Sequence, residues 1–158
     1  MLSRTFLWPQ GYTSAAMISV NLDAEFYGRI FYPGIDVSEG DIQRLGWTGM
    51  EYGLPHLLDC FREHGVKGTF FIPGRVAELY PDAVRAIADA GHELGCHGYE
   101  HEILAHFTPE EQLELLKKAK AAIEKAAGRA VTGFRMPEGE ITEQTLVAAK
   151  EAGFAYSS

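Results

Sequence analysis

The sequence lacks the features that direct a protein to a membrane or to nucleic acid. No window approaches the roughly 18 continuous apolar residues of a membrane-spanning helix. Residues 1–16 carry Arg4 but no uninterrupted apolar segment of the kind found in a signal peptide. The formal net charge of −8 provides no basic surface for phosphate backbones or anionic lipids. We therefore expect neither nucleic acid nor a membrane as a partner.

Cysteine is also scarce, with two residues in a chain of 158. Cys60 falls in a predicted helix and Cys96 at a predicted strand end, which is typical of small buried residues in a reducing compartment. Cys96 adjoins His97 and could bind a metal, but a buried structural role is favoured. The chain is 46% hydrophobic and 23% charged, as ordinary soluble domains are. We expect one cytoplasmic domain over residues 1–158.

The chain alternates short strand-like runs with amphipathic helical segments. Four times a glycine separates helix from strand, where a left-handed residue ends the helix without a Cβ penalty; these are Gly65, Gly91, Gly128 and Gly153. The predicted strands are 16–22, 66–72, 92–96, 130–134 and one that begins at 154, and the predicted helices are 54–64, 81–90, 109–127 and 143–152. This alternation predicts parallel pairing through right-handed crossovers, and therefore an α/β sheet or a (β/α) barrel.

The helix predicted over 109–127 has the clearest start. Thr108 is in position to cap it, and Glu111 stands three residues later to complete a capping box. Pro109 suits the first helical position. We expect this helix to pack against the sheet through its apolar face.

Residues 26–52 form a connection that is too long for an ordinary loop between a strand and a helix. Its aromatic residues are Phe26, Tyr27, Phe31, Tyr32, Trp47 and Tyr52. Two interpretations stay open. The segment is either a functional lid whose rings stack on a sugar or a flat heterocycle, or a hydrophobic cluster that closes one end of a barrel.

Two histidines follow the third predicted strand, in the segment Cys96-His97-Gly98-Tyr99-Glu100-His101-Glu102. On a helical turn, residues four apart share a face, so His97 and His101 could both direct a ring nitrogen at one divalent cation. Taken alone, such a pair is also typical of surface or hydrogen-bonded histidines. A hydrolytic centre needs a third ligand, and Asp23 after the first strand is our candidate. Functional residues of α/β folds gather at the C-terminal ends of strands, so we expect these residues and Arg135 at one rim.

Three segments carry a more specific signal: Asn21-Leu22-Asp23-Ala24-Glu25, His97-Gly98-Tyr99-Glu100-His101-Glu102 and Arg135-Met136-Pro137-Glu138-Gly139. In this order they resemble the motifs of the polysaccharide deacetylase family, the NodB-homology group also called carbohydrate esterase family four. The connecting residues 51–55 and 68–74 resemble that family too. The Gly-Tyr form of the histidine motif is most similar to the branch of intracellular peptidoglycan deacetylase-like proteins, cyclic imide hydrolases and allantoinase-like enzymes. The resemblance implies a partial (β/α) barrel with about five parallel strands and four helices.

The resemblance also implies a metal-dependent hydrolase of non-peptide C–N bonds, most directly one that removes an N-acetyl group from an amino sugar or polysaccharide. In the family an aspartate and two histidines hold a divalent metal, commonly zinc, and the matching positions are Asp23, His97 and His101. Such a metal lowers the pKa of bound water from about 15.7 toward 7. Arg135 resembles the arginine that orients the catalytic aspartate, and Pro137 the proline that shapes the groove. From the residues alone, they could also be a surface cation and a strand terminator.

One position departs from the family motif. The general base of this branch, an aspartate two residues before the metal aspartate, is replaced by Asn21, which cannot accept a proton. A general base contributes a factor of about 10² to 10⁴ in rate. Either Glu25, Glu100 or Glu138 substitutes, or activity is low, or the protein is a catalytically silent binding module. Among enzymes, the alternative to deacetylation is the opening of a cyclic imide or amide.

The chain ends inside the fifth predicted strand, whereas a complete barrel usually needs about 200 residues or more. We expect a truncated domain that lacks the later strands and the histidine that the resemblance implies as general acid. A bare edge at the fifth strand would expose unpaired backbone groups, so we expect a homo-oligomer. The expected substrate is a carbohydrate or another small molecule.

Overall fold

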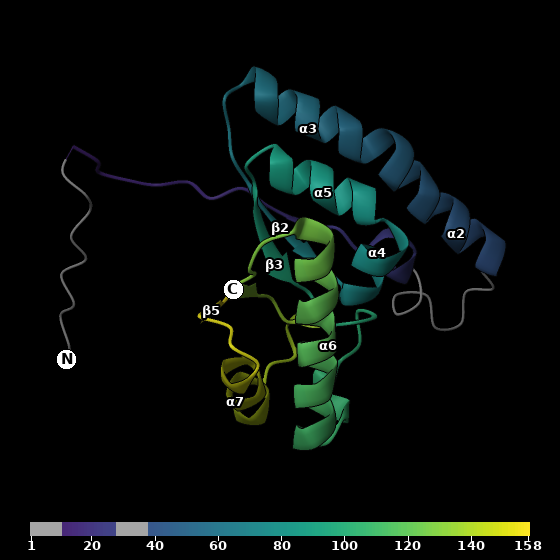
Figure 1. Ribbon diagram of the computed structural model, residues 1–158, viewed down its shortest axis with the longest axis vertical. Coiled ribbons are helices and arrows are strands. Elements are labelled where there is room, and N and C mark those ends of the chain that lie inside the picture. Colours follow the sequence, from purple (N-terminus) through teal and green to yellow (C-terminus); the bar gives the residue numbers. More distant parts are fainter. Residues whose placement is uncertain (1–10, 28–37) are drawn as a thin grey trace.

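The computed structural model describes residues 11–27 and 38–158 as one parallel sheet covered by helices (Figure 1). The sheet has the order β1-β2-β3-β4-β5, with β1 (Ser19–Asn21), β2 (Thr69–Ile72), β3 (Glu93–Cys96), β4 (Gly133–Phe134) and β5 (Tyr156–Ser157). Each strand pairs in parallel with the next strand in the chain, as in the wall of a (β/α) barrel. The predicted α/β fold with five parallel strands is confirmed, although each strand is shorter than predicted because ladder pairing covers only part of each apolar run.

Six α-helices lie within the described ranges: α2 (Glu39–Thr48), α3 (Leu54–Glu63), α4 (Gly74–Leu79), α5 (Pro81–Asp89), α6 (Pro109–Ala127) and α7 (Glu143–Glu151). Four of them match predicted helices, whereas α2 and α4 were not predicted, so the expected number of four helices is wrong. The short α4 begins with a glycine, and α2 contains two glycines, which weakens the helical pattern in both. No helix in this part of the chain combines the length and the apolar composition of a membrane span.

The part of the long connection that the structure describes is largely helical. After residues 28–37, which lie outside the described residues, α2 runs into a π-helical turn, η2 (Gly49–Gly53), and then directly into α3. Figure 1 shows α2 and α3 as one long rod along the side of the molecule. The Ser38 side chain accepts a hydrogen bond from the Asp41 backbone and so caps α2. The second half of the connection over 26–52 is therefore helical.

The described aromatic residues of this connection differ in their exposure. Phe26 is buried in the core, whereas Trp47 and Tyr52 are exposed. The rings of Trp47 and Tyr52 meet edge to face, with centroids 5.8 Å apart. Phe31 and Tyr32 lie outside the described residues. The proposed lid therefore stays a prediction.

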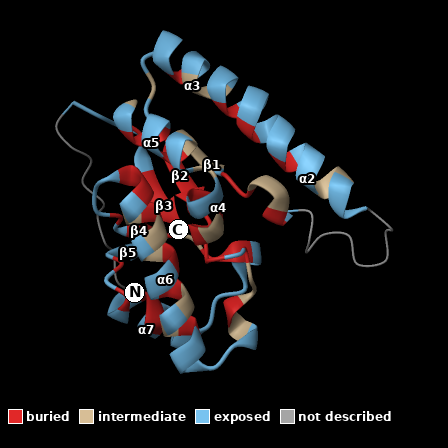
Figure 2. Cartoon of the chain, turned by 45° about the vertical axis from the view of Figure 1, so that its right-hand side comes forward, coloured by how far each residue is buried: buried red, intermediate tan, exposed pale blue. Residues whose placement is uncertain are grey.

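The core lies between the sheet and the helices, where Figure 2 shows β2 and β3 in the buried colour. All residues of β2 are buried, as expected of a parallel strand that is covered on both faces. The ring of Phe71 lies over Gly95, where an added Cβ would stand 2.5 Å from Phe71 Cδ1. Glycine at this position of β3 is therefore needed for the ring to fit.

The predicted capping box of α6 is confirmed. Thr108 Oγ1 accepts a hydrogen bond from the Glu111 backbone at 3.3 Å, and Glu111 Oε2 accepts one from the Thr108 backbone at 2.8 Å. At the other end, Gly128 has φ +70°, the left-handed conformation that a helix C-terminus favours. Both ends of α6 are thus specified by local sequence.

The two cysteines have different environments. Cys96 is buried at the end of β3, and burial raises the pKa of its thiol to about 12, which disfavours the thiolate needed for metal binding. Cys60 is exposed on α3, so its expected burial is wrong, because that face of the helix points to solvent. Both thiols are free.

Candidate metal centre

The C-terminal ends of β1 and β3 bring the three predicted metal ligands together. Asp23 follows β1 by two residues and His97 directly follows β3. His97 Nε2 lies 3.8 Å from Asp23 Oδ1, and His101 Nε2 lies 3.7 Å from Asp23 Oδ2. The ligand atoms of Asp23, His97 and His101 all lie within 4.8 Å of one another. Residues from two separate parts of the chain therefore form one cluster, as the strand-end argument predicts.

The two histidines are held by a loop, not by a helical turn as the spacing suggested. Gly98 has φ +74° and His101 has φ +62°, so two left-handed residues turn the loop back on itself. The rings of His97 and His101 then meet nearly at right angles, with centroids 4.9 Å apart. Glu102 stabilises this turn by accepting a hydrogen bond from the Tyr99 backbone at 2.8 Å.

The cluster contains buried polar atoms that have no hydrogen-bond partner. Asp23, His97 and His101 are 8%, 1% and 2% exposed. Within the described residues, Asp23 Oδ1, His97 Nε2 and His101 Nδ1 have no hydrogen-bond partner. Each such atom costs about 1–3 kcal/mol, and an unsatisfied group in a native fold calls for an explanation such as a bound ion. A cation shared by the three residues fits this donor set.

The backbone of Arg135 fixes the orientation of the His97 ring. Its Nδ1 lies 2.8 Å from the backbone carbonyl oxygen of Arg135. Because a carbonyl oxygen can only accept, His97 Nδ1 carries the hydrogen and donates the hydrogen bond. The lone pair of Nε2 therefore faces Asp23. A ligating histidine almost always has such a partner on its second nitrogen.

Burial sets the protonation states of the three residues. It lowers the pKa of His97 to about 4 and also lowers the pKa of His101. Burial, together with the nearby charge of Glu138, raises the pKa of Asp23 to about 7. Both imidazoles are therefore neutral at pH 7, which is the form that binds a metal.

The cluster borders a cavity of about 390 Å³. Beside the three ligand candidates, its lining consists of Asn21, Tyr27, Arg135, Met136, Glu138, Gly139 and Ser158. The predicted residues Asn21 and Arg135 thus lie at the same rim as the cluster. Pro137, between Met136 and Glu138, is buried, and an added Cβ on Gly98 would stand 3.1 Å from its Cγ. Pro137 therefore packs against the histidine loop at Gly98.

The guanidinium of Arg135 forms hydrogen bonds with neutral side chains from β1 and from the end of the chain. It donates to Asn21 Oδ1 at 2.9 Å, to Ser19 Oγ at 3.0 Å and to Ser158 Oγ at 2.7 Å. Its Cζ lies 4.1 Å from the centroid of the Phe71 ring, a cation–π contact. Sequence reasoning missed Ser19 and Ser158. The spacing of Ser19, two residues before Asn21, could have placed it on the same face of β1.

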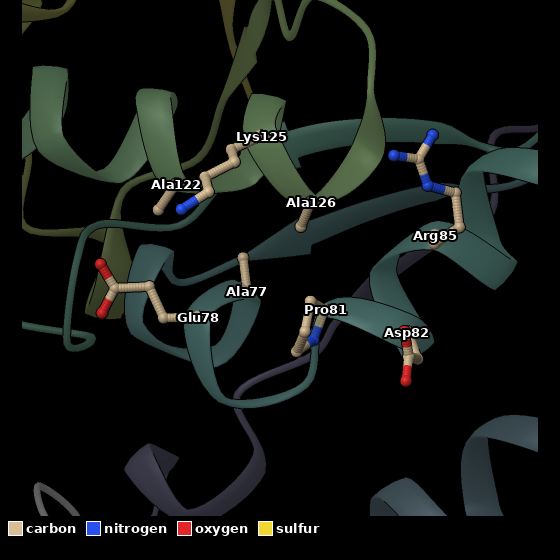
Figure 3. A pocket seen from close by; sticks show the side chains of 8 residues that line it. All are labelled: Ala77, Glu78, Pro81, Asp82, Arg85, Ala122, Lys125 and Ala126. Atoms are coloured by element: carbon tan, nitrogen blue, oxygen red, sulfur yellow. The ribbon is translucent and has the colours of Figure 1, made fainter.

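A second hollow of about 460 Å³ lies among α4, α5 and α6 (Figure 3). It is larger than the cavity at the histidines, but its charged side chains are two acidic and two basic ones, and its lining has no histidine or cysteine. The lining residues are Ala77, Glu78, Pro81, Asp82, Arg85, Ala122, Lys125 and Ala126. Size alone therefore does not identify the functional site of this chain.

Comparison with known sequences identifies the family of this chain. The sequence profile of the polysaccharide deacetylases matches residues 47–157, which include both histidines and Arg135 but not Asp23. The peptidoglycan deacetylase of Helicobacter pylori is 36% identical over 125 residues, which make up 79% of this chain and 42% of that protein. The chain thus spans less than half the length of this relative.

Solved structures show the same fold. A structure from Mycobacterium smegmatis, assigned to the polysaccharide deacetylases, matches 96% of this chain and 53% of its own with a TM-score of 0.83 and 33% identity. A mutant of a family-four pseudoenzyme, described as having restored enzymatic activity, matches 70% of this chain and 40% of its own with a TM-score of 0.66 and 31% identity. The unmutated pseudoenzyme is from Bacillus anthracis.

Proposed function

The chain belongs to the polysaccharide deacetylase family, and we propose that it removes N-acetyl groups from an amino-sugar polysaccharide with one divalent metal ion. The observation that carries this proposal is the buried cluster of Asp23, His97 and His101, whose ligand atoms lie within 4.8 Å of one another. The name of the Helicobacter pylori relative makes peptidoglycan the first polymer to test.

We propose zinc as the metal. Two imidazoles and one carboxylate are a common ligand set of catalytic zinc sites, which keep a further position open. A bound ion of this kind polarises an acyl carbonyl and makes water more acidic. Asp23, His97 and His101 would hold it, and Arg135 holds the Asn21 amide in place through the contact at 2.9 Å.

A direct test measures metal content and acetate release in the same preparations. The substrates are peptidoglycan and the soluble oligomer tri-N-acetylchitotriose, and succinimide and allantoin serve as comparison substrates for ring opening. We expect about one zinc ion per chain and acetate release that a chelator abolishes and added zinc restores. Bound zinc without acetate release from either acetylated substrate would contradict the proposed activity, and hydrolysis of succinimide or allantoin instead would favour ring opening.

A catalytically silent binding module is the second candidate, and Asn21 is the observation that favours it. The pseudoenzyme structures show that a similar fold occurs without activity and that a mutant can regain it. We expect Asn21→Asp to raise the rate of acetate release, by up to about 10² to 10⁴ if no other group acts as base. Asn21→Ala is the matched control, because it removes the amide without adding a carboxylate. No gain for Asn21→Asp at unchanged zinc content would contradict the view that the missing carboxylate at position 21 limits the activity.

Oligomerisation and location are further parts of the proposal. An edge strand of a sheet, such as β5, can pair with a second copy of the chain, and we propose a homo-oligomer of this kind. Light scattering that gives the mass of a monomer would contradict this pairing. The free thiols of Cys60 and Cys96 are compatible with the cytoplasm, and fractionation of the source cells would test that location.

A further inference from the structure

Asn21 cannot serve as the base of this site, because an amide does not take up a proton at neutral pH. An amide offers one acceptor, its oxygen, and this atom already accepts a hydrogen bond from Arg135 Nη1 at 2.9 Å. The remaining amide protons can only be donated. If the chain is a hydrolase, as proposed above, another side chain has to accept the proton of the attacking water.

The structure distinguishes the three carboxylates that could substitute. Glu25 accepts a hydrogen bond from the Tyr80 hydroxyl at 3.2 Å, and the cavity at the histidines is not lined by it. Glu100 is exposed on the histidine loop and is likewise absent from the cavity lining. Glu138 is the one of the three that lines the cavity together with Asp23, His97 and His101.

The side chain of Glu138 faces the cluster of Asp23, His97 and His101 without belonging to it. Its Oε1 lies 3.8 Å from His101 Nε2, and its side chain is 20% exposed although the residue lies at the surface. The ligand atoms that lie within 4.8 Å of one another come from Asp23, His97 and His101, and Glu138 is not in this group. It is therefore placed beside the cluster, where a group that contacts the attacking water is needed.

The backbone of Glu138 is held in an uncommon conformation. Its φ is +59°, inside the short helical turn η4 (Pro137–Gly139). A left-handed residue other than glycine costs about 1–3 kcal/mol and persists where the surroundings fix it, often at functional sites. Here the buried Pro137 precedes it, and Gly139 follows with φ +73°. This turn directs the carboxylate into the cavity.

We propose that Glu138 is the general base of this chain and replaces the carboxylate that is missing at position 21. The oxygen of the attacking water forms a bond to the acyl carbon while its proton moves to a carboxylate oxygen of Glu138. The same proton then passes to the amide nitrogen as the C–N bond breaks. The products are acetate and the free amine, and water is the only co-reactant.

The test compares Glu138→Gln with Glu140→Gln. Glu140 is an exposed neighbour two residues further on and does not line the cavity, so it is a matched control. Acetate release from tri-N-acetylchitotriose gives kcat, and competition with a chromophoric chelator gives the zinc affinity. We expect Glu138→Gln to lower kcat by about 10² to 10⁴ and to change zinc affinity by less than the roughly tenfold that loss of a ligand's support causes. Glu140→Gln should change neither quantity.

A second arm places Glu138→Gln in the Asn21→Asp background. If Glu138 substitutes for the missing base, its loss should cost far less kcat there, whereas a purely structural effect would cost the same in both backgrounds. The proposal is overturned by an unchanged kcat in Glu138→Gln, or by equal losses of kcat and zinc affinity. An inactive parent with an active Asn21→Asp variant would overturn both this proposal and the proposed activity of the parent, and would favour the catalytically silent binding module. Inactivity of both proteins with zinc bound would overturn the proposed function itself.

Discussion

Strand β3 has a buried histidine at each end, and the two differ in what their rings contact. His92 precedes the strand and is 2% exposed, whereas His97 follows it and is 1% exposed. His92 Nδ1 accepts a hydrogen bond from the Gly68 backbone at 3.1 Å, and its ring lies 5.3 Å and 5.2 Å from the rings of Phe61 and Phe70. His97 Nε2 has no hydrogen-bond partner in the described chain and lies 3.8 Å from Asp23 Oδ1.

Burial therefore does not distinguish the candidate ligand His97 from His92. Burial is the main cause that lowers the pKa of His92 as well as that of His97, so a shifted pKa does not distinguish them either. The distinguishing features are an unpaired nitrogen, a facing carboxylate and a position after the strand. In barrels of this kind, the N-terminal ends of the strands serve stability and the C-terminal ends serve chemistry.

The largest expected effect comes from removing each histidine in turn. His97→Ala should weaken zinc binding by more than about 100-fold, because loss of a ligand exceeds the 10–100-fold cost of losing a ligand's support. His92→Ala should leave the zinc affinity unchanged but destabilise the fold by about 2–4 kcal/mol, because it leaves a cavity between two rings and an unpaired backbone donor. Calorimetric titration and chemical denaturation measure the two quantities. Equal zinc losses in both variants would remove the distinction between the two ends of β3.

A smaller effect concerns Asp23 in the metal-free chain. Its pKa is raised in the fold to about 7 from 3.8, so the folded state binds more protons than the unfolded state, and stability falls as pH rises through this window. Asp23→Asn removes this loss. At pH 8 without metal, the variant should be more stable by roughly 1–3 kcal/mol, or about 2–4 °C in Tm for each kcal/mol. At pH 4 the two proteins should differ little.

Thermal unfolding at both pH values, with and without zinc, checks this prediction. The lowered pKa values of His97 and His101 act in the opposite sense, since stability from these groups rises with pH up to about 6.5. The difference between variant and parent is therefore the informative quantity. With zinc at pH 8, the parent should become the more stable of the two proteins, because zinc stabilises only the parent. A variant that is less stable than the parent at pH 8 without metal would contradict the burial of an unpaired carboxylate.

The smallest expected effect lies in α6, on the outside of the sheet. Thr108→Ala removes the side-chain acceptor of the confirmed capping box and should cost about 1 kcal/mol of unfolding free energy. Zinc affinity should stay that of the parent, because the change lies in the scaffold rather than in the cluster. Thr108→Ser retains the acceptor oxygen and is the matched control. A change in zinc affinity here would show that scaffold and site are not separable.

Much of the fold was predictable because its signals are local. Glycines such as Gly128 end helices, and apolar runs such as 66–72 indicate strands. The helices α2 and α4 were missed because glycine weakens their patterns and one of them has only six residues. Local patterns therefore predicted the five strands and four of the helices, but not α2 and α4.

The site was predictable to the level of residues but not of geometry. Residue types and strand ends placed Asp23, His97 and His101 at one rim, and the structure brings them together. The left-handed turn at His101 depends on backbone angles that spacing does not reveal. The choice among three carboxylates likewise depends on which of them lines the cavity, a property of tertiary structure.

A crystal structure of the chain grown with Zn²⁺ tests the central claim most directly, because anomalous scattering locates the ion. We predict one ion within about 2.0–2.2 Å of a ring nitrogen of His97, a ring nitrogen of His101 and a carboxylate oxygen of Asp23, with His92 remote from it. Zinc bound elsewhere on the chain, with this cluster empty, would contradict the account.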